Sequence, residues 1–232
     1  MHFKRIFLVC TILLTFNVTV LKAGDSASFV DLGFSADGSI YMFAQYGVQA
    51  GTLHPWADLF VVDVARNDFI PQGRISYTHD KPIDAGQDGA GALYRLLIKN
   101  AGLVERYGLS YPNQGQPLYI ALNGDPAYEG ITITFRDFVS DVSYRANLVE
   151  KISGSGKNVR SSFYITLEST GNNAEESFTI GTPKLERASI FSYRIKKVLV
   201  APSGNALIFV IEMKRHAENG HDIRYMVEAL RF

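Results

Sequence analysis

The sequence predicts a mainly β protein of the α+β class, in which antiparallel sheets carry one helix. Short runs of β-branched and aromatic residues recur along the chain, and turns rich in Gly, Asn, Asp and Ser separate them. One segment shows the period of a helix instead. The two chain ends carry similar hairpins, which is typical of a sandwich-like core or of hairpins in a partial propeller.

The first 23 residues predict a secretory signal peptide. Lys4 and Arg5 precede a mostly apolar run from Ile6 to Leu21, and the small residue Ala23 follows it. Thr and Asn interrupt this run, so it makes a poor membrane span, which needs about 20 mostly apolar residues. We expect cleavage near Ala23 and a single β-rich domain over residues 24–232, secreted, periplasmic or in the cell envelope. An uncleaved anchor is the alternative.

The composition of residues 24–232 excludes several function classes. Cys10 is the only cysteine and lies in the expected signal, so the domain has no disulfide and no thiolate metal site. The chain has 23 basic and 23 acidic residues and the signal holds three of the basic ones, which leaves a net charge of 20 − 23 = −3. This weak acidity argues against nucleic acid and anionic lipid as partners. Residues 24–232 contain no second apolar run of the kind that predicts a membrane span, so we expect none after signal cleavage.

Before the helix, the sequence predicts strands at Phe29–Phe34, Ile40–Tyr46 and Leu59–Val64. The segment Ser35–Gly38 is typical of a tight turn, because Asp bonds to the backbone that follows it and Gly accepts a positive φ. Residues 71–92 predict a loop, since two Pro and four Gly residues interrupt them.

The helix is expected at about Ala90 to Tyr107. Leu93, Leu97 and Val104 recur at intervals of four and seven residues, which places them on one helix face. Gly108 is a natural stop.

After the helix, strands are expected in the middle and at the end of the chain. The middle segment that begins at Ile131 alternates apolar residues with Thr, so we expect Ile133 and Phe135 on a buried face. The predicted strands are Leu118–Leu122, Ile131–Phe138, Tyr144–Ile152, Phe163–Leu167, Ser177–Ile180, Ile195–Val200, Ala206–Met213 and Ile223–Leu230.

The hairpins at the two chain ends align without gaps. Gly33–Phe43 matches Leu199–Phe209 in length, with Gly38 aligned on Gly204. We expect the two hairpins to share one sheet, because chain ends often meet, and the middle strands to form a second sheet or lobe.

A polar hairpin near the C-terminus holds candidate metal ligands. His216, Glu218, His221 and Asp222 lie within seven residues, and imidazole and carboxylate side chains bind divalent metals. Hairpin tips are usually polar and solvated, so a tip without a metal is the alternative. The sequence indicates no cofactor.

Aromatic side chains provide a candidate contact surface. Tyr46 and Trp56 flank a Gly-rich loop that also holds His54. Exposed aromatic rings in loops often mark binding sites, and their apolar faces can stack on sugars. We therefore expect these three residues to contact a ligand or partner, such as a glycan or an envelope protein.

Segments at both chain ends carry a resemblance to a known family. They are Phe29–Gly38, Gln45–Val48, Leu59–Val64, Val200–Gly204 and Ile223–Glu228. With these segments the chain resembles a family of predicted secreted bacterial proteins, domain of unknown function 2259. The resemblance implies an exported location in a bacterium, and it supplies no catalytic residues.

These observations predict a non-catalytic binding or interaction module of the cell envelope. The alternative is a periplasmic hydrolase that acts on glycans or peptides, with carboxylates or the His216 and His221 loop in its site. An enzyme would bring titratable groups together in a concave pocket, whereas a binding module would present an apolar patch.

Overall fold

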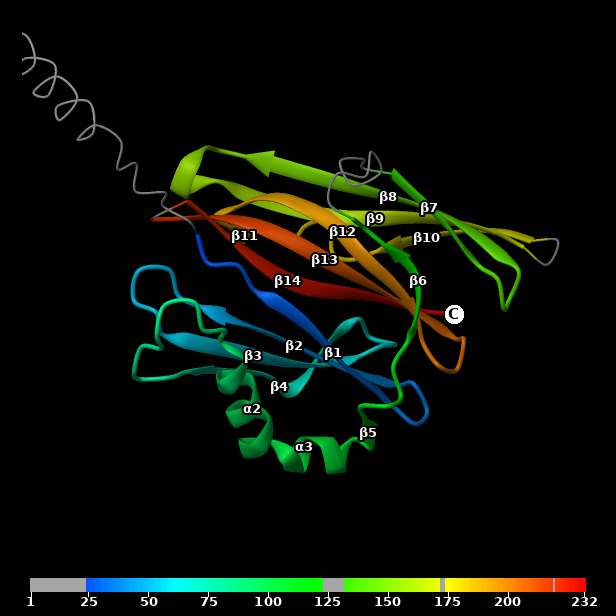
Figure 1. Ribbon diagram of the computed structural model, residues 1–232. Helices are drawn as coiled ribbons and strands as arrows, with labels where there is room; N and C mark the ends of the chain where they lie inside the picture. The colour runs from blue at the N-terminus through cyan, green and yellow to red at the C-terminus, as the bar shows by residue number, and fades with distance from the viewer. Residues whose placement is uncertain (1–23, 123–131, 172–173, 219) are drawn as a thin grey trace, which may run out of the picture.

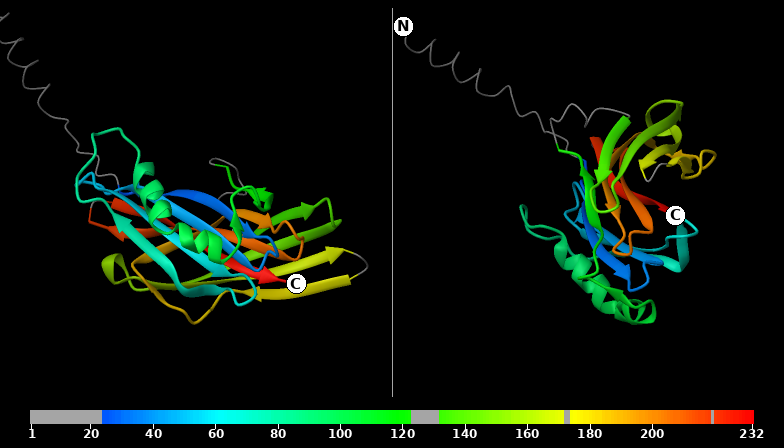
Figure 2. Two further views of the ribbon diagram at one scale, coloured as in Figure 1. Left: turned by 90° about the horizontal axis from the view of Figure 1, so that it is seen from below. Right: turned by 90° about the vertical axis from the view of Figure 1, so that its right-hand side faces the viewer.

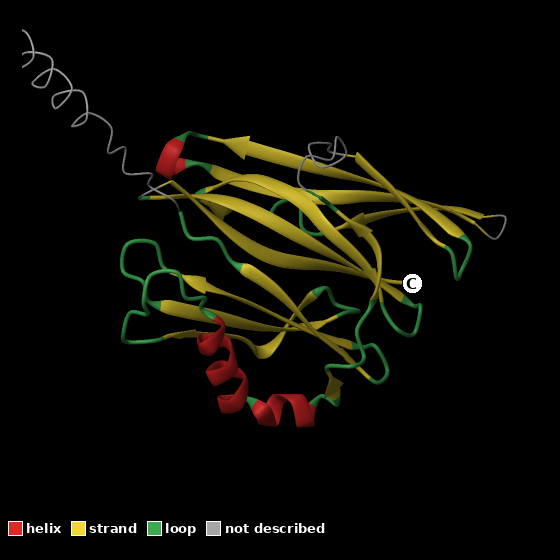
Figure 3. Cartoon of the chain, viewed as in Figure 1, coloured by secondary structure: helices red, strands yellow, loops and turns green. Residues whose placement is uncertain are grey.

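The computed structural model describes residues 24–122, 132–171, 174–218 and 220–232, so the expected signal peptide lies outside the described residues. The described chain forms three antiparallel sheets stacked face to face, with the α-helices on one outer side of the stack (Figures 1 and 3). This arrangement confirms the expected mainly β fold with antiparallel, sandwich-like sheets. Among the described residues, no helix combines the length and the apolar composition that crossing a membrane requires.

The first sheet has the strand order β4-β3-β2-β1-β5 and lies between the helices and the central sheet. Tyr41 and Phe43 of β2 point to the central sheet, while Met42 and Ala44 point to the helices. Alternate residues of a strand face opposite sides, so β2 is buried on both faces. The strands of this sheet are β1 (Ser28–Ser35), β2 (Ile40–Val48), β3 (Pro55–Asp63), β4 (Asp68–Thr78) and β5 (Leu109–Ser110).

The central sheet has the order β14-β13-β12-β6 and is covered on both faces. In β13, Leu207 and Phe209 pack against the third sheet, and Ile208 and Val210 pack against the first sheet. A strand between two layers needs a continuous apolar run, which the segment Ala206–Ile211 provides. The strands are β6 (Gln116–Ile120), β12 (Ile190–Val200), β13 (Ala206–Ala217) and β14 (Gly220–Arg231).

The third sheet forms the other outer layer, in the order β10-β9-β8-β7 with β11 paired to β9. Ile133 and Phe135 of β7 are buried and their Thr neighbours are exposed, as the alternation predicts. Figure 2 shows that this sheet extends beyond the other two at one end of the molecule. Its elements are β7 (Thr132–Asp137), β8 (Val142–Ser153), the 3₁₀ helix η2 (Gly156–Asn158), β9 (Arg160–Gly171), β10 (Ala174–Ile180) and β11 (Arg187–Ala188).

The expected helical segment is present, but it is divided into α2 (Ala90–Lys99) and α3 (Ala101–Arg106). The break lies at Asn100, whose backbone has φ −117° and ψ 21°. Its side-chain amide donates to the Leu96 carbonyl oxygen at 2.8 Å. Asn competes for backbone hydrogen bonds in this way, which favours helix ends over helix interiors. The chain changes direction at this point (Figure 1).

The expected loop over residues 71–92 is wrong for its first part, because residues 71–78 belong to β4. The pairing of β4 with β3 shifts register between Phe60 and Val62, opposite Pro71 and Gly73. β4 is an edge strand, and Pro and Gly are tolerated at edges and bulges. Pro and Gly therefore mark an irregular strand here.

The expectation that the terminal hairpins share a sheet is also wrong. The β1–β2 hairpin lies in the first sheet and the β12–β13 hairpin in the central sheet, and the two face each other. Gly38 and Gly204 have the same φ of 70°. A Cβ on Gly38 would lie 2.8 Å from Ser203 Oγ, so the two turns touch. The middle strands form a separate sheet, as expected.

Candidate functional site

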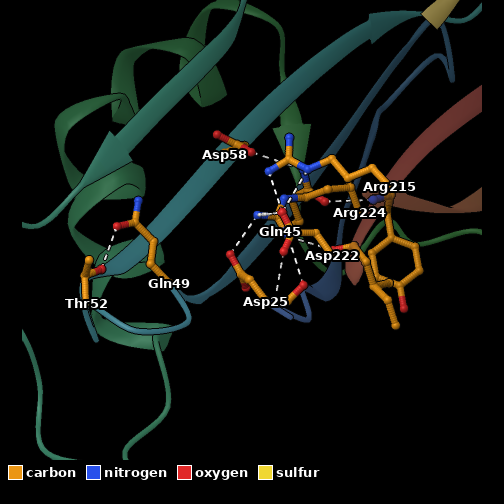
Figure 4. A network of polar contacts seen from close by, with 10 residues as sticks. Asp25, Gln45, Gln49, Thr52, Asp58, Arg215, Asp222 and Arg224 are labelled. Atoms are coloured by element: carbon orange, nitrogen blue, oxygen red, sulfur yellow. Dashed lines mark hydrogen bonds and ion pairs between the residues drawn. The ribbon is translucent and has the colours of Figure 1, made fainter. Parts of the chain in front are cut away.

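A polar network ties the first described residues to the central sheet (Figure 4). The Asp25 backbone N–H donates to Asp222 Oδ1 at 3.0 Å, and Arg224 donates to Asp25 Oδ2 at 2.7 Å. Arg215 donates to Asp222 Oδ2 at 2.9 and 2.8 Å. Each carboxylate faces a guanidinium, so the charges of these four side chains cancel.

Burial and pairing shift the pKa values in this network in opposite directions. Burial raises the pKa of Asp25, although Arg224 acts to lower it. Burial also acts on Asp222, but hydrogen bonds from the Asp25 N–H and Arg215 outweigh it and lower the pKa of Asp222. Burial lowers the pKa of Arg224. Asp222 is therefore held as a carboxylate by its partners.

The four candidate metal ligands lie in different surroundings. His216 and His221 pair across β13 and β14 and flank Phe191, with ring centroids 4.5 and 4.8 Å from its ring. Glu218 is exposed at a cavity of about 270 Å³ that Asp222 also lines. Within the described ranges, no three His, Cys, Asp or Glu side chains are grouped to hold a metal ion. A metal site here stays a prediction without geometric support.

Trp56 and His54 do not lie together on an open surface. Trp56 is 6% exposed, and the Arg224 guanidinium lies 4.2 Å from its ring centroid. The surface position expected for Trp56 is therefore wrong, because the ring forms the base of the polar network. His54 is half-buried in the loop before β3, and its carbonyl oxygen accepts the Gln49 N–H at 2.9 Å. A contact role for these two residues stays a prediction.

Side-chain amides cap the outer edge of β14. Gln45 Oε1 accepts the Tyr225 N–H at 2.8 Å, and Asn67 Oδ1 accepts the Ala229 N–H at 2.6 Å. Gln45 lies in β2, and Asn67 lies in the turn between β3 and β4. Edge strands with free N–H groups tend to pair with other chains. The amides block such pairing and join two layers, so we interpret the polar network as a structural clamp.

An apolar groove of about 600 Å³ lies beside α2, on the outer face of the first sheet. Val30 and Leu32 of β1 and Met42 and Tyr46 of β2 form its floor. These residues share a face because alternate residues of paired strands point to the same side of a sheet. Of the three residues predicted to contact a ligand or partner, Tyr46 is the one that lines this groove.

Helix α2 forms the wall of this groove. It packs mainly on β3, which leaves the neighbouring face of β1 and β2 open at its side. Gly89 sets this position, because a Cβ there would lie 2.2 Å from the Gly47 carbonyl oxygen. The residues of the wall and of the far end are Ala90, Leu93, Tyr94, Leu97, Val104, Leu109 and Tyr111.

Three tyrosines surround the groove. Tyr94 and Tyr111 are exposed, and Tyr46 is half-buried. Sequence reasoning found Tyr46 but missed the other two. Tyr94 directly follows Leu93 and borders the apolar helix face, which is a signal that the sequence offers. Tyr111 lies in a connection after β5, where no local pattern indicates its position.

The groove is lined by uncharged side chains, whereas the charged side chains of the polar network are paired with one another. Among known proteins, no curated sequence and no solved structure matches the chain. The family model described as "Predicted secreted protein (DUF2259)" matches residues 42–231, which is most of the chain. This match confirms the resemblance and the secreted location. The chain belongs to the DUF2259 family of predicted secreted proteins.

Proposed function

We propose that this secreted protein is a non-catalytic binding module of the cell envelope that holds an apolar ligand in the groove beside α2. The observation that carries the proposal is the groove itself. Its volume of about 600 Å³ is within the range of roughly 300–1,000 Å³ that small-molecule sites occupy. Its floor consists of Val30, Leu32, Met42 and Tyr46, and Tyr94 and Tyr111 also line it.

The lining favours one class of ligand over the others. Every described side chain that lines the groove is uncharged, so a phosphate or carboxylate would gain no ionic partner there. A glycan would find three tyrosine hydroxyls and many aliphatic carbons, which satisfy few of its hydroxyl groups. An acyl chain or an aromatic ring would replace water on the apolar floor and gain from that burial. The tyrosine hydroxyls would then form hydrogen bonds with a single polar group at one end of the ligand.

Binding of the apolar fluorophore N-phenyl-1-naphthylamine tests this proposal, with a fatty acid as competitor. We expect Tyr94→Ala combined with Tyr111→Ala to weaken probe binding by about 30-fold, since truncation of each contact tyrosine costs on the order of 1 kcal/mol. The control is Ile98→Ala, because Ile98 is 76% exposed on the same helix but does not line the groove. Equal affinities of all three proteins would contradict the proposal.

One observation favours the hydrolase alternative. Glu228 is only 5% exposed and lines a cleft of about 330 Å³. Burial raises its pKa, although the Asn67 amide, which donates to Oε2 at 2.5 Å, acts to lower it. A carboxyl group with a raised pKa can act as a general acid. Turnover of a chromogenic glycoside or peptide that Glu228→Gln abolishes would support this alternative, and no turnover would remove it.

A further inference from the structure

The turn between β7 and β8 exposes two adjacent apolar side chains. Phe138 is 83% exposed and Val139 is 81% exposed, more than any other large hydrophobic residue in the described part of the chain. The hairpin that carries them belongs to the sheet that extends beyond the other layers (Figure 2). We call these two residues the apolar tip. Single exposed apolar residues are ordinary, whereas two adjacent ones on a protruding turn form a small contiguous apolar surface.

Hydrogen bonds hold the apolar tip in one shape. Asp137 Oδ1 accepts the Val139 N–H at 2.8 Å, and Asp137 Oδ2 accepts the Ser140 hydroxyl at 2.7 Å. Asp141 closes the turn with a φ of 59° and pairs with Arg136. A turn fixed in this way loses little conformational entropy when its side chains are buried by a partner.

A shallow basin of about 550 Å³ lies on β7, β8 and β9, and Phe135 and Tyr144 line it together with polar and charged side chains. Arg136, Ser143 and Thr170 form one cross-strand row, and Arg145 and Glu168 belong to the next row. The Arg136 guanidinium lies 5.6 Å from the Phe138 ring centroid, so the basin and the tip are continuous. The basin offers two guanidinium groups, hydroxyl donors and one carboxylate.

We propose that the apolar tip and this basin dock the protein on a membrane of zwitterionic phospholipid. Phe138 and Val139 enter the layer of the upper acyl chains, and Arg136 and Arg145 donate to lipid phosphates. Glu168 faces the ammonium group that the headgroups of these lipids carry. This pairing of opposite charges fits a headgroup that carries both signs.

The shape of the site favours a membrane over a protein partner. A stable protein interface buries roughly 800 Å² on each side around an apolar centre. Two side chains on a convex turn supply too little apolar surface for such a centre, whereas shallow insertion into a bilayer needs only a protruding tip. The acidic residues beside the arginines, Asp141 and Glu168, disfavour a purely anionic surface.

Co-sedimentation with vesicles of phosphatidylethanolamine and phosphatidylcholine tests the proposal. Phe138→Ser combined with Val139→Ser should lower the vesicle partition coefficient at least about tenfold, because both apolar anchors are lost. Arg145→Gln should lower it by about threefold to tenfold. Ile98→Ser removes an exposed apolar residue elsewhere and should change nothing. Circular dichroism checks that each variant is folded.

A second measurement reads insertion directly. Trp56 is the only tryptophan and it is buried, so Phe138→Trp adds one exposed reporter. Its emission should shift to shorter wavelength on vesicles, and brominated acyl chains should quench it. The proposal is overturned if the wild-type protein does not sediment with these vesicles. It is also overturned if the double Ser variant sediments equally well, or if phosphatidylglycerol vesicles bind more tightly than the zwitterionic ones.

Discussion

Replacement of Arg224 by Met should destabilise the protein by about 3–5 kcal/mol at pH 7, because a buried ion pair that loses one partner leaves an unpaired charge. Asp25 is buried and Arg224 is largely buried, with side chains 6% and 14% exposed, and their charged groups are 2.7 Å apart. Arg224 also donates to the Asp25 and Ile223 carbonyl oxygens. Met retains apolar contact with the Trp56 ring, so the change mainly removes the charge and its hydrogen bonds.

The size of this penalty should depend on pH in a defined direction. Burial already raises the pKa of Asp25 above 3.8, and Arg224 is the strongest influence that lowers it. Without Arg224 the pKa of Asp25 rises further, so the carboxyl takes up a proton at a higher pH. The penalty is full above this raised pKa and fades as the pH falls towards the unfolded-state value of 3.8.

Urea denaturation from pH 4 to pH 8, followed by Trp56 fluorescence and circular dichroism, measures the penalty. Arg231→Met is the control, since Arg231 is an exposed arginine on the same strand and surface changes stay within about 0.5 kcal/mol. Arg224→Met combined with Asp25→Asn should recover part of the loss. A penalty below about 1 kcal/mol at pH 7, or one independent of pH, would refute the buried-charge argument.

The remaining predictions concern three single positions, Asp37, Gly24 and Gly91. The Asp37 carboxyl should titrate by NMR with a pKa of about 2, because Ser35 and Ser39 donate to its carboxylate. The stability that this carboxylate contributes is present above pH 3.8 and is lost as the pH falls to about 2. A pKa near 3.8 in the folded protein would contradict this prediction. Gly24→Ala should destabilise by about 1–3 kcal/mol, because its Cβ would lie 1.9 Å from the His221 carbonyl oxygen. Gly91 lies on an open face of α2, so Gly91→Ala should stabilise the protein by up to about 1 kcal/mol in the same denaturation assay. Equal effects of Gly24→Ala and Gly91→Ala would contradict the tight packing of Gly24 against His221.

Local patterns were sufficient for most of the elements. The alternation around Ile133 and Phe135 predicts β7 and its buried face, and the matching turns at Gly38 and Gly204 predict two equivalent hairpins. Such signals depend on neighbours in sequence, and strand geometry translates them directly into structure. The continuous apolar run Ala206–Ile211 also indicates a strand that is covered on both faces. The prediction that the two terminal hairpins share one sheet did not take this signal into account.

The polar network could not be predicted in the same way, because its members are far apart in sequence. Asp25 and Arg224 are 199 residues apart, and Gln45 and Tyr225 are 180 apart. Trp56 appears in sequence as a loop aromatic, and only the packing of Arg224 over its ring reveals a buried role. Pairings of this kind depend on how the sheets stack, and no local period encodes them.

The groove has a physical origin in the division of the helical segment. The apolar residues Val30 and Met42 need cover on the outer face of the first sheet, but α2 packs mainly on β3. A helix that continued without a break would carry Val104 onward along the direction of α2. At Asn100 the chain turns instead, and Val104 closes the far end of the groove. The break therefore places α2 and Val104 on two sides of an apolar floor, in which Leu32 and Met42 are buried and Val30 and Tyr46 are half-buried. An apolar ligand held between these two sides, as we propose, would replace the water on the part of the floor that the helices leave exposed.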